Sequence, residues 1–335
     1  MTENSISFVI IGASGDLARR KVIPALFSLD CQGLLPENFR VVGFARSDFT
    51  REKFRAAIAE HLECRYKCGK PSSAQIYSFL EKCFYCRGQY ESADSFSALR
   101  KVLESLEPVE GANRLYYLAI PPSVFGGVIG ALGAADMVCK PGDAAWSRVV
   151  IEKPFGYDRE SSDRLVMETK RVFDESQIFR IDHYLGKEVV QNLFVLRFAN
   201  IVFEPLWNRK YVKSVQITWK EPGGIGTRAG YFDESGIIRD VIQNHLLQIM
   251  AMAAVEPQEK FDGVSFRRRK NELLRAVSPV TLDDMAFGQY QGGERDGKRL
   301  PAYLEEQGVR PNSLTPTCAA AVLHVNNVTR QIMPW

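Results

Sequence analysis

The 335-residue chain lacks the sequence features of membrane and exported proteins. No stretch approaches the ~18 uninterrupted apolar residues of a membrane-spanning helix. The first residues carry no basic segment ahead of an apolar one, so an N-terminal export signal is not expected. These absences predict a cytoplasmic protein with no membrane partner.

The chain also has little charge imbalance. It contains 43 Lys and Arg residues against 40 Asp and Glu residues, which gives a net charge of +3. Such a balance does not favour a nucleic-acid partner, although it is compatible with phosphate-bearing small molecules. One short basic run, residues 267–270, is predicted to be the solvated face of a helix.

Cysteines are few and unevenly spaced. There are seven, an odd number, and their scatter does not indicate a disulfide framework. Four of them have a spacing that resembles a four-cysteine zinc site. The alternative, which we favour, is a set of reduced, partly buried thiols, because aromatic residues separate the last two. The four are Cys64, Cys68, Cys83 and Cys86.

The first 180 residues alternate short apolar runs with longer mixed segments, a pattern typical of βαβ units and a parallel sheet. The runs are continuous and rich in β-branched residues, as strands buried on both faces are. We therefore predict an N-terminal Rossmann-like domain over residues 1–178, with a doubly wound parallel sheet. Its expected strands are 8–11, 40–44, 115–120 and 148–151.

The pattern changes after about residue 180. Helical spacing is followed by alternation, which indicates an antiparallel sheet with one buried face. We predict an α+β domain over residues 179–335. Its expected elements are a helix at 187–198, a strand at 211–220, a long helix at 236–255, a loop-rich stretch at 256–316 and a strand at 319–325.

A glycine-containing turn follows the first predicted strand and opens a helix. Gly12 would permit the tight turn, and Gly15 would let the backbone approach a pyrophosphate at the helix start. The spacing departs from Gly-x-Gly-x-x-Gly, so an ordinary strand–helix turn is the alternative. The predicted cofactor-binding residues of this turn are Gly12, Ala13, Ser14, Gly15, Asp16 and Leu17.

The end of the second predicted strand bears on the choice of dinucleotide. An NAD site would place Asp or Glu there to bind the ribose 2′-hydroxyl. This strand ends in Gly43-Phe-Ala-Arg-Ser47, and no acid occurs before Asp48. Because the guanidinium of Arg46 suits a dianionic 2′-phosphate, NADP is favoured over NAD.

Three later segments carry polar side chains suited to a phosphorylated alcohol. Lys153, in Glu-Lys-Pro-Phe-Gly, follows a buried strand and could bind a sugar hydroxyl or the nicotinamide end; a solvated lysine is the alternative. The bond before Pro154 is a candidate for the cis form. In residues 180–188, His183, Tyr184 and Lys187 offer several donors for a phosphate dianion.

Two acid–base candidates accompany these donors. Asp182 could orient a histidine, or could simply cap a helix. His245 lies with Asp240 and Asn244 on a helix otherwise rich in apolar residues. A neutral imidazole is the natural base for an alcohol proton near pH 7, although a lone helix histidine is more often a satisfied core residue.

Taken together, these segments resemble the glucose-6-phosphate dehydrogenase family in order and spacing, from Phe8 to about Val325. The resemblance implies NADP-dependent oxidation of glucose 6-phosphate to 6-phosphogluconolactone, the entry into the pentose phosphate pathway. His245 would take the C1 hydroxyl proton and Asp182 would pair with it, without a metal. His183, Tyr184 and Lys187 would bind the 6-phosphate, while Lys153, Glu221 and Asp240 would bind sugar hydroxyls.

The chain also departs from the family pattern. Phe125 stands where a tyrosine is usual, and residues after about Val325 diverge before the chain stops at Trp335. We therefore expect an incomplete antiparallel sheet and loss of most of the dimer surface of a homodimeric or tetrameric family. Two functional classes follow: an active dehydrogenase, or an NADP-binding form with little activity that perturbs full-length subunits. A different two-domain sugar oxidoreductase is disfavoured by residues 180–188.

Overall fold

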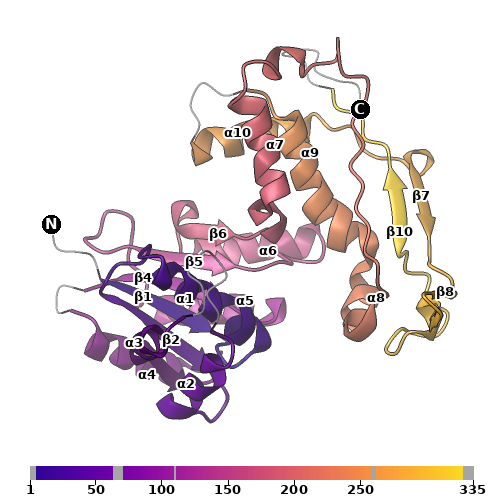
Figure 1. Ribbon diagram of the computed structural model, residues 1–335. Coiled ribbons are helices and arrows are strands. Elements are labelled where there is room, and N and C mark those ends of the chain that lie inside the picture. The colour runs from indigo at the N-terminus through magenta and orange to yellow at the C-terminus, as the bar shows by residue number, and fades with distance from the viewer. Residues whose placement is uncertain (1–4, 63–70, 109–110, 258–261, 327–335) are drawn as a thin grey trace. The chain divides into compact units, whose positions relative to one another are not determined.

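The computed structural model describes residues 5–62, 71–108, 111–257 and 262–326. The chain divides into two compact units, Met1–Ile181 and Asp182–Trp335. Figure 1 shows a parallel sheet with its helices in the first unit and mainly helices with short strand pairs in the second. No helix within the described ranges is both long and apolar enough to cross a membrane.

The N-terminal unit is built on one six-stranded parallel sheet with the strand order β3-β2-β1-β4-β5-β6. The order runs outward from β1 in both directions, so a crevice is expected at the carboxyl ends of β1 and β4, where the strand order reverses. This confirms the predicted doubly wound sheet. The strands are β1 (Ile6–Ile11), β2 (Phe39–Ala45), β3 (Cys83–Arg87), β4 (Asn113–Leu118), β5 (Ser147–Ile151) and β6 (Ile178–Arg180).

Helices cover this sheet on both faces because successive strand residues point to opposite sides. On β1, Val9 and Ile11 enter one hydrophobic cluster, whereas Ile6 and Ile10 enter another. The π-helical turn Ala18–Val22 leads into the first helix. The helices are α1 (Ile23–Cys31), α2 (Arg51–Ala59), α3 (Ser73–Glu81), α4 (Ala93–Leu106), α5 (Phe125–Ala134) and α6 (Arg159–Lys170).

The same alternation bears on the four-cysteine pattern, for which reduced thiols are favoured over a zinc site. Cys83 and Cys86 both lie on β3, but Cys83 belongs to one hydrophobic cluster and Cys86 to the other. Their side chains therefore point to opposite faces of the sheet and cannot ligate one metal ion. Burial raises the pKa of both thiols, that of Cys83 to about 12. The other two cysteines of the pattern, Cys64 and Cys68, fall outside the described residues.

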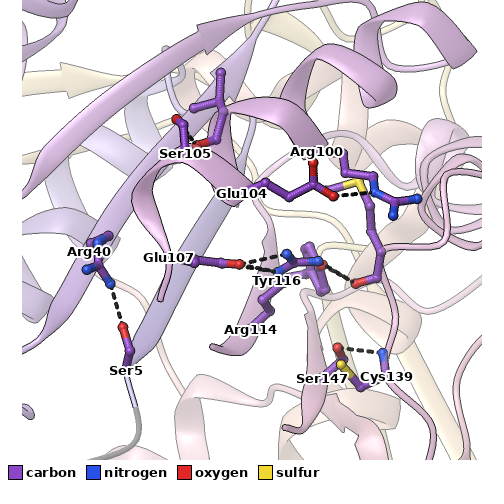
Figure 2. Close-up of polar contacts among 12 residues, drawn as sticks. Ser5, Arg40, Arg100, Glu104, Ser105, Glu107, Arg114, Tyr116, Cys139 and Ser147 are labelled. Carbon is purple, nitrogen blue, oxygen red and sulfur yellow. Dashed lines mark hydrogen bonds and ion pairs between the residues drawn. The ribbon is translucent and has the colours of Figure 1, made fainter. Parts of the chain in front are cut away.

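Polar contacts close the end of the sheet where β4 begins (Figure 2). Arg114 on β4 forms an ion pair with Glu107, just past α4, with Nη2 and Oε2 2.6 Å apart. The two side chains are only 14% and 3% exposed. Two residues along the strand, Tyr116 donates its buried hydroxyl to the carbonyl oxygen of Met137. These bonds tie α4 and the loop after α5 to the sheet.

The C-terminal unit contains helices and two small antiparallel strand pairs, β10 with β7 and β8 with β9. Figure 1 shows α7 alongside α9. The helices are α7 (Glu188–Phe198), α8 (Ala229–Ile237), the π-helix Ile238–Leu246, α9 (Leu247–Ala254) and α10 (Gly263–Arg275). The strands are β7 (Met285–Gly288), β8 (Gly293–Arg295), β9 (Lys298–Leu300) and β10 (Cys318–Ala321).

These elements confirm an α+β unit with a small antiparallel sheet, but one expected element is wrong and two differ in extent. The expected strand at 211–220 is not formed, because these residues pair with no other described segment and a strand needs a partner for its backbone groups. The stretch 256–316 is also less irregular than expected, since it contains α10 and three of the short strands. The expected strand at 319–325 is shorter: β10 ends at Ala321, and Val325 forms an isolated bridge with Val277.

A buried carboxylate organises the second half of this unit. Asp233 on α8 accepts hydrogen bonds from Tyr303, from Arg310 and from Ser313. Arg310 also donates to the backbone carbonyl of Asp233, at 3.1 Å. The bonds from Ser313, Arg310 and Tyr303 outweigh the burial of Asp233 and lower its pKa to about 2. One helix residue therefore anchors the chain from Tyr303 to Ser313.

Candidate active site

The turn after β1 is held in a form that requires glycine. Gly12 has a φ of +90°, and a Cβ there would lie 2.2 Å from the carbonyl oxygen of Ala119. Its N–H donates to the carbonyl oxygen of Phe44 at 2.8 Å. The adjacent Ala13 is buried, and a Cβ on Gly43 would come within 2.8 Å of the Ala13 methyl group. The ends of β1, β2 and β4 thus converge at this turn.

Beyond Gly12 the turn opens to solvent. Ser14 is half-buried, whereas Gly15, Asp16 and Leu17 are exposed at the start of the helical segment. Ser47, just past β2, donates its hydroxyl to that of Ser14 at 2.9 Å, which links the turn to the segment that carries Arg46. The backbone N–H groups at a helix start are suited to a diphosphate, and here they lie beside an open surface.

Arg46 follows β2 and remains exposed, with its guanidinium carbon 5.2 Å from the centroid of the Tyr90 ring. The nearest acid in sequence, Asp48, forms an ion pair with Arg87 at 3.0 Å. A positive, planar group therefore lies next to the glycine turn, and the neighbouring carboxylate is engaged elsewhere. These residues fit a dinucleotide with a phosphate on its ribose better than one with a free 2′-hydroxyl.

The ends of β4 and β5 carry the third candidate of the N-terminal unit. Lys153 is half-buried just after β5 and precedes a cis peptide bond to Pro154, a form that the sequence left open. The preceding residue, Glu152, accepts a hydrogen bond from the hydroxyl of Tyr117 on β4. Burial and this bond raise the pKa of Tyr117. Phe125, where the family usually has tyrosine, is completely buried in a hydrophobic cluster.

In the C-terminal unit, the structure brings Asp182 and His245 together although 63 residues separate them. Asp182 Oδ1 lies 2.8 Å from His245 Nδ1. The same oxygen accepts the backbone N–H of Tyr184 at 2.9 Å, so Asp182 caps the short helix after it and also contacts the imidazole. Burial opposes ionisation of Asp182, but the bonds from His245 and Tyr184 outweigh it and lower its pKa.

The π-helix Ile238–Leu246 places both buried polar candidates of its segment. Its i→i+5 bonding widens each turn, so residues five apart, such as Asp240 and His245, lie closer to one face than they would in an α-helix. Gly236 enters the segment at a φ of +67°, which ends the regular geometry of α8. Tyr231 donates its hydroxyl to Asp240 at 3.3 Å.

Aromatic contacts hold the imidazole in place. The ring of Tyr184 stacks on that of His245 at a centroid distance of 3.9 Å and an interplanar angle of 16°. His183 meets His245 edge-on at 4.8 Å. The ammonium of Lys187 lies 3.5 Å from the centroid of the Tyr184 ring. Two exposed donors, His183 and Lys187, therefore lie beside a buried histidine and its partly buried carboxylate partner.

Not all predicted residues join this group. Glu221 is exposed and forms an ion pair with Arg228 at 3.3 Å, and the predicted residues of the N-terminal unit lie in a separate compact unit. Sequence reasoning missed Tyr117 and Tyr231, whose hydroxyls bind Glu152 and Asp240. A tyrosine next to the carboxyl end of a buried strand, or at the start of a segment with buried acids, is the signal that could have found them.

The donor atoms of Asp182, His183 and His245 lie within 4.8 Å of one another, the spacing of a three-ligand metal site. The carboxylate already binds the imidazole nitrogen of His245. That pairing is the arrangement of a general base with its orienting group, so we keep the acid–base interpretation and the prediction of no metal.

The fold defines a class first: a dinucleotide-binding protein, with a doubly wound sheet and a glycine turn, whose second unit carries a histidine–carboxylate pair. The chain belongs to the glucose-6-phosphate dehydrogenase family. The family model described as "Glucose-6-phosphate dehydrogenase, NAD binding domain" matches residues 9–192. The model of the C-terminal domain of the same family matches residues 194–335.

Curated relatives carry the same family name. The chain is 45% identical over 335 residues to chloroplastic glucose-6-phosphate 1-dehydrogenase 1 of Arabidopsis thaliana, a match that covers 99% of this chain and 57% of the relative. It is also 45% identical to glucose-6-phosphate 1-dehydrogenase of Dictyostelium discoideum, covering 98% of this chain and 65% of that relative. The chain therefore spans less than two thirds of the length of these proteins.

Solved structures agree. A glucose-6-phosphate dehydrogenase in complex with its substrate glucose-6-phosphate matches with a TM-score of 0.89 and 38% identity, covering 98% of this chain and 67% of that one. Glucose-6-phosphate 1-dehydrogenase from Mycobacterium avium matches with a TM-score of 0.81 and 32% identity, covering 97% of this chain and 67% of that one.

Proposed function

We propose that this chain oxidises glucose 6-phosphate at C1 with NADP and forms 6-phosphogluconolactone and NADPH, the first reaction of the pentose phosphate pathway. The observation that carries the proposal is the contact between buried His245 and partly buried Asp182, 2.8 Å apart, with His183 and Lys187 exposed beside it. A base next to two phosphate donors matches the needs of a phosphorylated sugar alcohol.

The residues of the N-terminal unit fit NADP. The turn Gly12 to Leu17 would hold the diphosphate at the helix start, Arg46 would bind the 2′-phosphate, and Lys153 would lie toward the nicotinamide end. When bound, NADP would supply the hydride acceptor for C1. NADP is favoured over NAD because Asp48 is paired with Arg87 and Arg46 is exposed.

His245 would accept the hydroxyl proton of the sugar on the ring nitrogen that faces away from Asp182. Asp182 would hold Nδ1–H, fix the imidazole ring and stabilise the imidazolium that forms. Because hydrogen bonds lower the pKa of Asp182, the carboxylate stays ionised and keeps this role at neutral pH. The stacked Tyr184 ring restrains the imidazole and excludes water from one of its faces.

The remaining predicted residues would bind the sugar phosphate. His183, Tyr184 and Lys187 would contact the 6-phosphate, and Lys153, Glu221 and Asp240 would contact hydroxyls. Tyr231 would hold the carboxylate of Asp240. A cytoplasmic location stays a prediction, because the Arabidopsis relative is named as chloroplastic.

A second candidate function is an NADP-binding form with little turnover, which would perturb longer subunits of its family. It is favoured by residues 212–221, which carry Glu221 and form no ladder with another described segment. A substrate ligand on such a segment would be poorly fixed.

The purified chain separates the two candidates. With glucose 6-phosphate and NADP, we expect NADPH formation that is abolished by His245→Asn, while binding of glucose 6-phosphate, measured by calorimetry, survives. His324→Asn is the matched control, since His324 also faces a carboxylate, Asp284 at 3.7 Å, but is 56% exposed. Turnover retained in His245→Asn would refute the assigned base, and absent turnover with intact NADP binding would favour the second candidate.

Cofactor choice has its own test. Arg46→Ala should weaken NADP binding roughly 10- to 100-fold, the value of one or two charge-assisted hydrogen bonds, and leave NAD binding nearly unchanged. Arg171→Ala, on an exposed arginine of the same unit, is the control. Tighter binding of NAD than NADP, with no effect of Arg46→Ala, would show that the assignment is wrong.

A further inference from the structure

A short hydrogen bond joins the carboxyl ends of β4 and β5 within the N-terminal unit. In the register of these parallel strands Tyr117 lies beside Val150, so Glu152, two residues further along, follows β5 on the same side of the sheet. The hydroxyl of Tyr117 donates to Glu152 Oε1 at 2.5 Å, the length of a hydrogen bond to a carboxylate. Both side chains are half-buried. Burial and this bond raise the pKa of Tyr117, so its hydroxyl stays a donor at neutral pH.

The preceding residue of β4, Tyr116, makes a contact of a different kind. Its ring belongs to the hydrophobic cluster on one face of the sheet, whereas Tyr117 packs against the cluster on the other face. The hydroxyl of Tyr116 donates to the backbone carbonyl of Met137, in the loop after α5. Of these two adjacent tyrosines, only Tyr117 bonds Glu152, the residue that immediately precedes Lys153.

The chain after Lys153 is fixed by packing. Phe155 packs against the hydrophobic cluster that includes the end of β5. Gly156 has a φ of +82°, and a Cβ there would lie 2.6 Å from the backbone nitrogen of Ser162. The segment that carries Lys153 is therefore held on its far side by close backbone packing, and on its near side by the bond from Tyr117.

Strand β4 also borders the glycine turn. Ala119, just past β4, carries the carbonyl oxygen that a Cβ on Gly12 would approach to 2.2 Å. Tyr117 precedes Ala119 by only two residues. The bond to Glu152 therefore ties the segment of Lys153 to the same strand end that fixes the glycine turn.

We propose that Tyr117 and Glu152 are positioning residues, whose hydrogen bond sets the place of the Lys153 ammonium relative to the glycine turn. The glycine turn and Lys153 would hold two ends of one dinucleotide, so an error in their separation would weaken the contacts at the nicotinamide end. Tyr117 and Glu152 would act through Lys153 and not by touching the cofactor. For cofactor and substrate the inference rests on the proposed function; for the place of Lys153 it does not.

The first test needs neither cofactor nor turnover. It measures the rate at which acetic anhydride acetylates Lys153, by peptide mass spectrometry, with the exposed Lys101 as the reference. Tyr117→Phe should raise the relative rate at Lys153 roughly 3- to 10-fold, the ratio that corresponds to the net value of one hydrogen bond. The rate rises because the half-buried lysine is then exposed more often. Glu152→Leu, which removes the acceptor, should have the same effect.

Two variants serve as controls. Tyr116→Phe removes the hydroxyl of the adjacent tyrosine on the opposite face, so it should lower the Tm but leave the rate at Lys153 unchanged. Glu152→Gln keeps an acceptor for the hydroxyl of Tyr117, so its rate should lie closer to that of the unaltered protein than the rate of Glu152→Leu does. If Tyr117→Phe and Glu152→Leu change the rate no more than Tyr116→Phe, the inference is overturned.

The proposed function can fail separately. If the unaltered chain forms no NADPH, the dehydrogenase assignment fails, while the acetylation rates still test the hydrogen bond. If it turns over, Tyr117→Phe should lower kcat/KM by a similar factor and Tyr116→Phe should not. The loss should vanish when Lys153 has already been changed to Ala, because the bond acts through that side chain. Equal losses with and without Lys153 would overturn the inference.

Discussion

The two units of this chain are held together in different ways. Among the described residues, the largest completely buried side chains of the N-terminal unit are mostly aromatic, for example Phe27, Phe44 and Phe96, whereas those of the C-terminal unit are Arg197 and Tyr303. In the part of the chain that the structure describes, the first unit has two large hydrophobic clusters, and the second has one cluster of six buried residues. Non-directional apolar burial thus dominates the first unit, and directional polar bonds carry much of the second.

Exposed apolar side chains show the same contrast. In the C-terminal unit Ile201 is 89% exposed and Leu314 is 93% exposed. Its completely buried Arg197 bonds the carbonyl oxygen of Met252 at 2.9 Å, and burial lowers its pKa to about 10. A unit of this kind depends on each polar partner, because a buried polar group that loses its bond is costly.

The largest expected effect concerns the apolar core of the N-terminal unit. Phe96 on α4 is completely buried, and its ring centroid lies 5.1 Å from that of Phe44. Phe96→Ala should lower the free energy of unfolding by about 3–5 kcal/mol, through lost transfer energy and the cavity left behind. Phe287→Ala on β7, at a side chain 49% exposed, should cost less than about 1 kcal/mol. Urea unfolding measures both, and similar costs would contradict the contrast.

A smaller effect is expected for the buried ion pair of the same unit (Figure 2). Glu107→Ala leaves Arg114, only 14% exposed, without its carboxylate, and should cost about 3 kcal/mol. Glu104→Ala removes a partner of Arg100 on the same helix, where the side chains are 51% and 42% exposed, and should cost under about 1 kcal/mol. Equal losses in urea unfolding would show that burial does not set the strength of these pairs.

The contrast also explains which parts of the fold could be predicted. Strands β1, β2, β4 and β5 could be predicted from their continuous apolar runs, because both faces of a parallel strand are buried. Strand β3 was not predicted because it carries two cysteines and an arginine, and β6 was not predicted because it spans only three residues. In the C-terminal unit, alternation at 211–220 predicted a strand, but pattern alone supplies no partner strand.

The residues of the candidate site also differ in how far the sequence could predict them. The glycine turn and Arg46 follow from local sequence, since each lies directly after a predicted strand. The contact between Asp182 and His245 was expected only from the family resemblance, because no local pattern joins residues so far apart. The π-helix that carries both Asp240 and His245 has no sequence signature of its own. For Asp182, both readings of the sequence hold, since one oxygen caps a helix and also contacts the histidine.

The smallest expected effect is a difference between the two units in how their stability depends on pH. Asp233 has a pKa of about 2 in the folded state, below the usual value of about 3.9 for an unfolded chain. A lowered pKa means that the stabilisation is complete above the unfolded value and is lost as the pH falls from about 4 toward 2. Asp233→Asn should cost about 1.5–3 kcal/mol at pH 7, the range for hydrogen bonds to a charged group, and should remove this acid dependence.

Fluorescence of the tyrosines and tryptophans during acid titration, with hydrogen exchange to locate the change, measures the effect. The C-terminal unit should open first between pH 4 and 2 in the unaltered protein, and the Asn variant should show a flatter dependence over that range. Asp284→Asn is the control, because its carboxylate caps a short helix through Thr281 and faces only His324, so its loss should leave the 303–313 segment protected. Opening of the parallel sheet at the same pH as the Asp233 network would mean that the two units do not differ in what stabilises them.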